Sequence, residues 1–548
     1  MSLDYVMIGY KLWTIDETYP VVLSEGSAYR NFLRKHVAYD NKKFYYNDLY
    51  TYLLNGNLDI EKGYKKSYFS VHEIPYLSVL TILDFLRNNG LKAEGINLFD
   101  AERERLDHLL DQSPTFVGIS TSAFTSVAPI VRIVRYVRNR SPESKIVLGG
   151  AYLYDLYWHS EKAFLESIKV LGGDYYVVEP QGERTLLELI QKHKNSQSVK
   201  DVCNVFIMEN GTVHFKKFER ELNDLDRQAI RWDRVDPHLL STTVLVRTSR
   251  GCPFKCKFCY YPLRNNKLQM ASIETVEKEL RQINEHGVKT VVFVDDMLNT
   301  SKKRINELCK MIIRNKFNFS WCAYMRLDNL SEESAYLLAE SNCAGVLVGI
   351  ETANNKILEL MCKKITVETY KQSLTWLNQY SVNTLAFILT GFPGETKETV
   401  QETIDLLNSG LINYYMVNLW YAHKGTPVYG KDDEFGLTGD GFEWKHSTMD
   451  HKIASDLTDE MVKKVTNSIY IPPGDFGMLS IPYLLGKGFT LPQVDQLLIY
   501  TNKLMMRNIG VPCDEQECIA KITDILRRCY ETNQKDMQHE QTSQFYPA

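Results

Sequence analysis

Three cysteines lie close together in the segment RGCPFKCKFCYYP, where three residues separate Cys252 from Cys256 and two separate Cys256 from Cys259. Three thiolates can bind three irons of a [4Fe-4S] cluster and leave the fourth iron open to another ligand. A closed zinc site would need a fourth protein ligand, usually from a second C-x2-C pair. Cys513 and Cys518 are far away in the sequence and have a different spacing. The spacing therefore favours an iron-sulfur cluster with one open iron.

An apolar, strand-like run directly precedes the cysteines and opens a series of alternating strands and helices. Helical segments such as 272–287 and 397–410 separate the expected strands. Six strand-helix repeats predict a partial (β/α)6 barrel, whose chemistry would lie at the carboxyl ends of the strands. The expected strands are 243–249, 289–296, 319–326, 345–351, 383–391 and 414–422.

An earlier α/β series runs from residue 68 to 194 and alternates helical segments with short apolar strands. This alternation predicts a doubly wound parallel sheet, and ligands of such sheets bind beyond the carboxyl ends of the strands. Small residues at two of these ends would allow a ligand to approach the backbone closely. These residues are Ser120, Thr121, Ser122, Gly149 and Gly150.

The cysteine spacing, with the aromatic Phe258 directly before the third cysteine, resembles the signature of the radical S-adenosylmethionine (SAM) superfamily. The resemblance implies that the open iron binds SAM, whose reductive cleavage yields a 5′-deoxyadenosyl radical. Acidic and glycine residues at the later strand ends follow in the order that the family shows. A lone acidic pair is more often a cap and a Gly-Phe-Pro-Gly loop a turn, but this order favours SAM contacts. The implied contacts are Asp295 and Asp296 to the methionine amino group, Arg326 at a strand end, Gly349 and Glu351 near the ribose, and Gly391 and Pro393 around the adenine.

A doubly wound domain before such a barrel resembles the cobalamin-binding arrangement of one large class of these enzymes. The resemblance covers the strands that end at 122 and 152 and the loop that carries Glu183, and it implies cobalamin as a further cofactor. The sequence contains no D-x-H-x-x-G motif, which supplies the histidine ligand of cobalamin in many mutases and synthases. Cobalamin would then bind without a histidine, while a domain that binds nothing stays an alternative. His72 is interpreted as a surface or capping residue.

Three further segments, 26–50, 444–450 and 467–488, resemble the P-methyltransferase family of phosphinothricin tripeptide biosynthesis. The resemblance implies methyl transfer to an unactivated carbon or a phosphinate phosphorus of a natural product or peptide. His446, Thr448 and Asp450 are then candidate catalytic or substrate-binding residues. The same segment also fits a helix start, with Ser447 or Thr448 as the cap and Asp450 in the first turn.

Two other function classes remain open at this stage. The protein could be a radical SAM enzyme that performs an epimerisation, cyclisation or rearrangement by hydrogen abstraction without methyl transfer. An iron-sulfur protein without catalysis is disfavoured by the ordered motifs along the barrel.

The composition limits which partners and which cellular location are expected. The 548 residues carry 64 Lys and Arg against 68 Asp and Glu, a net charge of −4, which gives no global basic field for nucleic acid or an anionic membrane. No run of eighteen apolar residues and no secretory signal pattern occur, so a cytoplasmic enzyme is expected. Its expected partners are a small-molecule or peptide substrate and an electron donor such as flavodoxin or ferredoxin.

The sequence predicts an α/β protein with a mainly helical C-terminal region. The predicted divisions are an N-terminal segment 1–67, a cobalamin-binding-like domain 68–194, a connector 195–243 with a hairpin at 204–215, a barrel 244–430, a helical domain 431–530 and a mobile tail 531–548.

Overall fold

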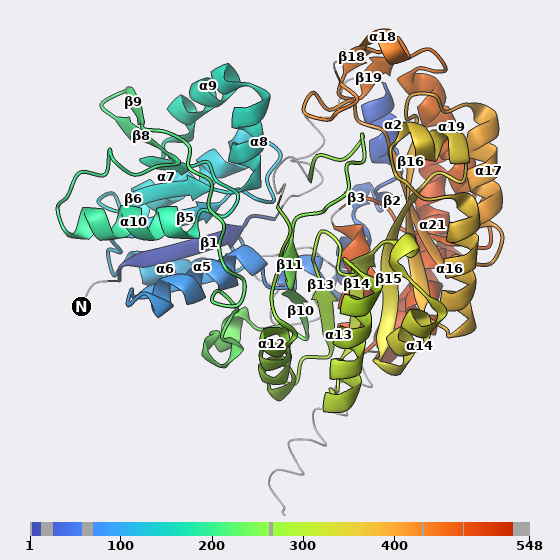
Figure 1. Ribbon diagram of the computed structural model, residues 1–548, viewed down its shortest axis with the longest axis horizontal. Coiled ribbons are helices and arrows are strands. Elements are labelled where there is room, and N and C mark those ends of the chain that lie inside the picture. Colours follow the sequence, from blue (N-terminus) through green and yellow to red (C-terminus); the bar gives the residue numbers. More distant parts are fainter. Residues whose placement is uncertain are drawn as a thin grey trace, which may run out of the picture. The chain divides into compact units, whose positions relative to one another are not determined.

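The computed structural model describes residues 3–12, 26–56, 69–261, 267–429, 432–474 and 476–529, and the predicted tail lies outside them. The chain forms two compact units (Figure 1). The first unit comprises Met1–Leu12, His72–Ser241 and Leu268–Ile283, and the second comprises Trp13–Val71, Thr242–Lys267 and Asn284–Ala548. None of the described helices combines the length and the hydropathy that a bilayer-spanning helix needs.

The first unit contains a seven-stranded sheet in the order β4-β1-β5-β6-β7-β8-β9. Its five parallel strands therefore follow the order 2-1-3-4-5 along the chain, an order typical of doubly wound domains. The run YVMIGY forms the inner strand β1, which is fully buried as expected for a parallel sheet covered on both faces. The parallel strands are β1 (Tyr5–Tyr10), β4 (Ala93–Leu98), β5 (Phe116–Ser120), β6 (Lys145–Gly149) and β7 (Tyr175–Val177).

Helices cover this sheet in two groups. On one face α5 (Leu77–Asn88) contacts α10 (Glu183–Lys194). The other group is α6 (Arg103–Leu110), α7 (Val127–Arg140), α8 (Ala151–His159) and α9 (Glu161–Leu171), in which α7 contacts both α6 and α9. The helix α12 (Ile273–Glu285) contributes Glu279, which accepts a hydrogen bond from the Trp232 indole at 3.3 Å.

Two predicted boundaries of the first domain are wrong. Strand β1 lies in the predicted N-terminal segment, yet it pairs with β4 on one side and β5 on the other, so the sheet cannot form without it. The predicted connector forms the hairpin of β8 (Val205–Glu209) and β9 (Thr212–Phe215), which extends the sheet antiparallel to β7. The predicted turn is confirmed, since Asn210 and Gly211 both have positive φ.

The second unit contains a seven-stranded parallel sheet in the order β10-β13-β14-β15-β16-β17-β20. All six predicted barrel strands are present. The short β20 (Ile469–Tyr470) adds a seventh from beyond the predicted end of the barrel, because it pairs with the beginning of β17. The six are β10 (Thr243–Val246), β13 (Thr290–Phe293), β14 (Ser320–Met325), β15 (Cys343–Glu351), β16 (Asn383–Thr390) and β17 (Tyr414–Leu419).

The helices between these strands begin at polar capping residues. In each case the cap side chain accepts a hydrogen bond from the backbone N–H three positions later, which satisfies a donor that the first turn leaves open. The helices and their caps are α13 (Lys302–Asn315) with Ser301, α14 (Glu332–Glu340) with Ser331, α15 (Asn355–Leu360) with Asn354, α16 (Val367–Gln379) with Thr366, and α17 (Lys397–Leu407) with Thr396.

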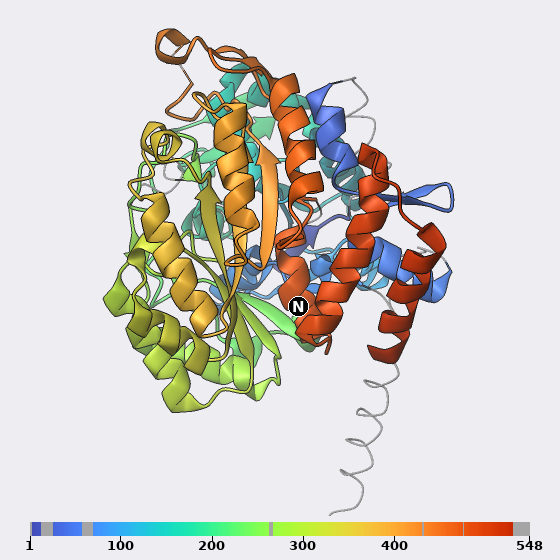
Figure 2. The same cartoon turned by 90° about the vertical axis from the view of Figure 1, so that its right-hand side faces the viewer.

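Residues from both ends of the chain complete the second unit. The helix α2 (Ser27–Leu33) packs on α19 (His451–Lys464), which Figure 2 shows as a blue helix beside an orange one. The buried Arg34 and the neighbouring Arg30 both form ion pairs with Asp459 of α19. The second unit also contains the hairpins β2 (Val37–Tyr39) with β3 (Lys42–Phe44) and β18 (Thr438–Asp440) with β19 (Glu443–Lys445), and the helices α3 (Tyr46–Asn55), α18 (Asp432–Phe435), α20 (Ser480–Gly486), α21 (Leu491–Met506) and 515–529.

Candidate active site

The three predicted cluster ligands lie in the loop that follows β10, at the carboxyl end of the second sheet. Cys256 is buried, and Cys252 and Cys259 are half-buried. Burial raises the pKa of the Cys259 thiol to about 12 and also raises the pKa of Cys252. These thiols need nearby positive charge to ionise, which the irons of a cluster would supply. Three sulfur donors on one loop fit a [4Fe-4S] cluster with one open iron.

The described residues contain no preformed site for a single metal ion. Among the described residues, no group of three or more His, Cys, Asp and Glu side chains is arranged to hold one ion.

The two aspartates after β13 brace the cysteine loop. Asp295 is almost completely buried, and its carboxylate accepts hydrogen bonds from the backbone N–H groups of Thr248, at 2.7 Å, and Ser249. Burial raises the pKa of Asp295 to about 6, although these hydrogen bonds act in the opposite direction. Asp296 is half-buried and accepts from the N–H of Gly251 at 2.7 Å. Asp295 therefore fixes the backbone of the cysteine loop through these hydrogen bonds. A contact of Asp296 with SAM stays a prediction.

Arg326, which directly follows β14, lies against the same loop. Its guanidinium stacks on the Phe254 ring at 3.7 Å and places Nη1 3.9 Å from the Cys256 sulfur. A two-pronged pair with Asp328, both contacts at 2.9 Å, fixes the plane of the guanidinium. Arg326 thus supports the loop and brings a permanent positive charge close to a predicted cluster ligand.

Glu351, at the end of β15, has a strained backbone. Its φ is +66°, a conformation that residues with a side chain rarely adopt, at a point where the pairing of β15 with β16 shifts register. Its Oε1 accepts from Nζ of Lys363 at 3.1 Å. A Cβ at position 349 would lie 2.3 Å from Glu351 Oε1 and 3.0 Å from Lys363 Nζ, so a larger residue there would displace the ends of both side chains. The predicted residues Gly349 and Glu351 therefore do lie together, and the sequence did not indicate Lys363.

The loop after β16 is held by a buried carboxyl group. The N–H of Gly391, whose φ is +92°, donates to Oε2 of Glu395 at 2.5 Å. Burial raises the pKa of Glu395 to about 8. A Cβ at position 391 would lie 2.7 Å from the Trp444 ring, so no larger residue fits there. Pro393 is buried in the same loop, which is therefore rigidly built at the carboxyl end of the sheet.

His446, one of the candidate catalytic residues, has partners for both ring nitrogens. Its Nε2 donates to the carbonyl of Gly391 at 3.1 Å, since a carbonyl oxygen can only accept. Its Nδ1 then accepts from the Thr448 hydroxyl at 3.1 Å. The ring stacks on Trp444 with centroids 5.0 Å apart, and burial lowers its pKa. His446 and Thr448 therefore hold the Gly391 loop in place.

Asp450 is the N-cap of α19. Its Oδ1 accepts from the N–H groups of Lys452 at 3.0 Å and Ile453 at 2.9 Å. The helix-start alternative is therefore confirmed for this segment, but with Asp450 as the cap in place of Ser447 or Thr448.

In the first unit, the predicted loops meet at the carboxyl edge of the sheet. The N–H of Thr121 donates to the carbonyl of Gly149 at 2.7 Å, and the Thr121 hydroxyl donates to the same atom at 3.1 Å. A Cβ at Gly150, whose φ is +128°, would lie 2.7 Å from the backbone nitrogen of Ser122. Ser120 ends β5, which is parallel to β1, and between these two strands the order in which strands are added to the sheet reverses. Such a switch point is the usual ligand crevice of these folds.

An aromatic stack that the sequence did not indicate lies at the end of β1. Tyr10 packs against His72 with centroids 4.4 Å apart and against Tyr76 at 5.1 Å, and all three rings are nearly parallel. Phe124, just after β5, contacts Tyr10 at 5.9 Å. The interpretation of His72 as a surface residue is wrong, because its side chain is buried in this stack.

Glu183 has a structural role at the start of α10. It is buried, and its Oε2 accepts from the Asn223 amide at 2.6 Å. Glu221 nearby accepts from the N–H groups of Arg184 at 3.0 Å and Thr185 at 2.8 Å and so caps the helix from a distant segment. These contacts anchor the segment 221–223, and a contact of Glu183 with a cofactor stays a prediction.

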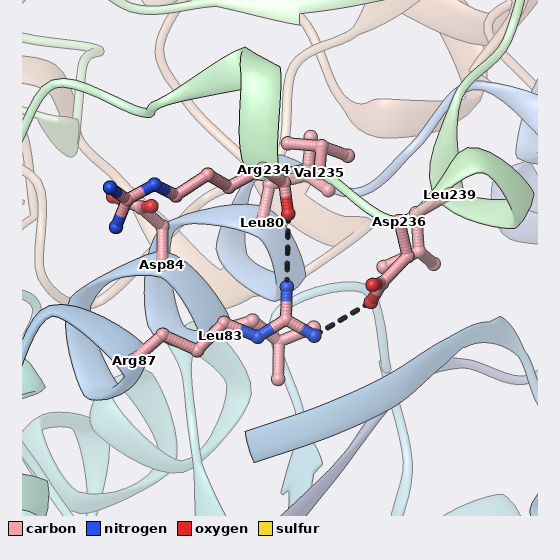
Figure 3. Close-up of a pocket in the computed structure, with 8 residues that line it drawn as sticks. All are labelled: Leu80, Leu83, Asp84, Arg87, Arg234, Val235, Asp236 and Leu239. Carbon is pink, nitrogen blue, oxygen red and sulfur yellow. Dashed lines mark hydrogen bonds and ion pairs between the residues drawn. The ribbon is translucent and has the colours of Figure 1, made fainter. Parts of the chain in front are cut away.

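Arg87 is one of the residues that line a small cavity in the first unit, shown in Figure 3. The guanidinium donates to the Arg234 carbonyl at 3.3 Å and to Asp236 at 2.7 Å, and it ties α5 to the segment 234–239. The volume of the cavity, about 10 Å³, leaves room for one water molecule at most. The cavity therefore holds no substrate.

Comparison with known proteins identifies the part of the chain that carries the cysteine loop. Residues 246–407 match the family model described as Radical SAM superfamily, from the end of β10 to the last turn of α17. These residues form a radical SAM domain, which implies a [4Fe-4S] cluster and SAM as cofactors. The match covers less than half of the chain, and the predicted roles of the cysteine loop rest on this domain.

Individual relatives extend the similarity beyond the barrel. The chain is 26% identical over 370 residues to an uncharacterized methyltransferase of Pyrococcus horikoshii, covering 65% of this chain and 78% of the relative. It is 23% identical over 343 residues to the anaerobic magnesium-protoporphyrin IX monomethyl ester cyclase of Rubrivivax gelatinosus, covering 59% of each chain. The fold resembles the radical SAM methyltransferase TsrM of Kitasatospora setae, solved with cobalamin and a [4Fe-4S] cluster, with a TM-score of 0.61 and 16% identity over 85% of this chain and 98% of TsrM. The chain therefore shares the fold of a cobalamin-binding radical SAM enzyme.

Proposed function

We propose that the protein is a cobalamin-dependent radical SAM methyltransferase. The observation that carries the proposal is that one chain joins a radical SAM domain to a 2-1-3-4-5 sheet with small residues at its switch-point edge. The methyltransferase name of the Pyrococcus relative and the cobalamin bound by TsrM support it.

The residues of the second unit would hold the cluster and SAM. Cys252, Cys256 and Cys259 supply the thiolates, and Asp295, Asp296 and Arg326 fix the loop that carries them. The Glu351 carboxylate and the Gly391 loop would receive SAM at the strand ends, where bound SAM is held away from solvent. When bound, the cluster supplies the electron that cleaves SAM and cobalamin carries the methyl group.

The residues of the first unit would hold cobalamin at the edge formed by β1, β5 and β6. The half-exposed Gly149 and Gly150 and the exposed Ser122 present little side-chain bulk there, so a large planar ring could approach the backbone. The stack of Tyr10, His72 and Tyr76 beside this edge would stiffen it. These features fit cobalamin held without a histidine ligand.

The substrate would be a natural product or peptide with an unactivated carbon or a phosphinate phosphorus. Such atoms lack a reactive lone pair, so a methyl group cannot be delivered to them as a cation. The resemblance of 26–50, 444–450 and 467–488 to the phosphinothricin-pathway P-methyltransferases supports this class. An electron donor such as flavodoxin or ferredoxin and a cytoplasmic location belong to the same proposal.

The products of SAM test the proposal. Protein reconstituted anaerobically with iron, sulfide and hydroxocobalamin, then reduced with SAM and candidate substrates, should form 5′-deoxyadenosine and S-adenosylhomocysteine in similar amounts. Cys256→Ala should lose the iron-sulfur absorbance and 5′-deoxyadenosine formation, whereas Cys513→Ser, outside the loop, should keep both. Retention of a full iron complement and SAM cleavage in Cys256→Ala would contradict the assignment of the cluster ligands.

The alternative is a radical reaction without methyl transfer. The Rubrivivax relative is named as a cyclase, which supports this alternative. Formation of 5′-deoxyadenosine without S-adenosylhomocysteine, over a full range of substrates, would support this alternative against methyl transfer.

A further inference from the structure

Lys363 is a buried charged residue for which the sequence gave no function. Its side chain is 6% exposed, and its ammonium group forms an ion pair with Glu351 at 3.1 Å. Burying a lysine is costly unless a partner offsets the lost hydration. Packing alone therefore does not account for a lysine at this buried position.

The backbone around Lys363 is strained on both sides. Cys362 and Lys364 have φ values of +53° and +55°, and the partner Glu351 has +66°. Each of these residues carries a side chain, so each conformation costs of the order of 1 kcal/mol or more. Strain of this kind persists where the surrounding structure fixes it, and it concentrates at functional sites.

Lys363 also connects the parts of the SAM site. Its carbonyl accepts from Nη2 of Arg326 at 2.6 Å, and Arg326 in turn contacts Cys256. Its ammonium lies 5.6 Å from the centre of the Phe258 ring, next to the cluster ligand Cys259. One residue thus contacts the strand end that carries Glu351 and the residue that supports the cysteine loop.

The ion pair occupies only one oxygen of Glu351. Lys363 binds Oε1, and Oε2 has no hydrogen-bond partner among the described residues, while the carboxylate as a whole is 12% exposed. A carboxylate with one oxygen fixed and the other open suits the two adjacent hydroxyl donors of a ribose.

We propose that Lys363 is a positioning residue of the SAM site, which holds Oε1 of Glu351 so that Oε2 faces the ribose hydroxyls of SAM. Through its carbonyl it also keeps Arg326 against the cysteine loop. The proposal rests on the part of the proposed function in which SAM binds at the barrel, and it is independent of cobalamin and methyl transfer.

Equilibrium dialysis of radiolabelled SAM against the anaerobically reconstituted, oxidised protein tests the proposal without turnover. Lys363→Met, which keeps the length of the side chain and removes the charge, should weaken SAM binding about tenfold, as expected for loss of one charge-assisted contact. Lys364→Met is the matched control, because Lys364 is the exposed neighbour with a similar backbone conformation, and it should bind SAM within twofold of the wild type.

A double-mutant cycle separates positioning from general support of the fold. If Lys363 acts through Glu351, then Lys363→Met should weaken binding no further in a Glu351→Gln background. Iron content should stay close to the wild-type value in all variants, so that a change in SAM binding reports on the site. Wild-type SAM affinity in Lys363→Met, or effects that multiply in the double variant, would overturn the proposal. Should Lys363→Met fail to hold iron, wild-type affinity in Glu351→Gln would overturn it equally. Loss of methyl transfer with normal SAM binding would count against the proposed function and leave this inference intact.

Discussion

At the scale of single residues, Glu395 is a carboxyl group that the fold prefers in its neutral form. It is buried, and the N–H of Gly391 donates to it. Burial raises its pKa from the ordinary value of 4.5 to about 8. The folded protein therefore keeps a proton between these two pH values that the unfolded chain releases, and the free energy of unfolding falls as the pH rises through this window.

Glu395→Gln should remove this pH dependence, because the amide oxygen can still accept from Gly391 and cannot ionise. The slope for one proton is about 1.4 kcal/mol per pH unit at most. Urea unfolding at pH 6 and pH 8 should therefore show the variant gaining stability relative to wild type by roughly 1–2 kcal/mol at the higher pH. A constant difference between the two proteins across this range would show that Glu395 is not the titrating group.

At the scale of the elements, the start of α19 decides between two interpretations of Asp450. As an N-cap, Asp450 should be replaceable by Asn, which caps equally well, and Ala should cost about 1 kcal/mol of stability. We therefore expect Asp450→Asn to keep both stability and turnover and Asp450→Ala to lower the unfolding midpoint. Lys452→Ala on the same turn is exposed and should have little effect. Loss of turnover in Asp450→Asn at unchanged stability would instead support a catalytic role.

Gly149 and Gly150, at the end of β6, differ in the space that a side chain would have there. A Cβ at Gly149 would meet only the Val177 side chain at 3.4 Å, whereas a Cβ at Gly150 would lie 2.7 Å from the Ser122 backbone with φ at +128°. Gly150→Ala should therefore separate the two loops and lower cobalamin retention on gel filtration by several fold. Gly149→Ala is the matched control and should retain cobalamin like the wild type. Equal retention by both variants would exclude this edge as the cobalamin site.

Sequence patterns predicted the elements that depend on local signals. The barrel strands were found because short apolar runs alternate with helical segments such as 272–287 and 397–410. Strand β1 was missed because its partners β4 and β5 lie far along the chain and no helix follows it in the described residues before α2. A strand pairing over such a distance leaves no periodic signal.

Side-chain direction explains why the site was only partly predicted. Asp295 and Asp296 are adjacent beyond the end of β13, and both accept from backbone N–H groups of the cysteine loop, yet Asp295 is buried and Asp296 is half-buried. The sequence cannot tell which is which until the sheet is in place. Lys363 was missed because only the folded chain brings it next to its partner Glu351, and no recognised sequence motif surrounds the lysine.

At the scale of the whole molecule, the two units are interleaved along the chain. The first unit takes residues from three separate stretches, and the second unit takes the stretches between and after them. The predicted division into successive domains, which followed the alternation of strands and helices, is therefore too simple. Neither unit corresponds to one continuous stretch, so the cofactor chemistry has to be tested on the full chain.

The last prediction concerns how many cobalamins the full chain binds and through which ligand. One doubly wound sheet offers one switch-point crevice, so protein loaded with hydroxocobalamin should retain about one equivalent through gel filtration. The sequence lacks D-x-H-x-x-G, and His72 packs in the stack with Tyr10 and Tyr76. Electron paramagnetic resonance of the reduced Co(II) form should therefore show no nitrogen splitting from a protein histidine. Loss of all cobalamin on the column would refute the methyltransferase proposal. Histidine splitting that disappears in His72→Gln would keep the function and identify His72 as the lower ligand.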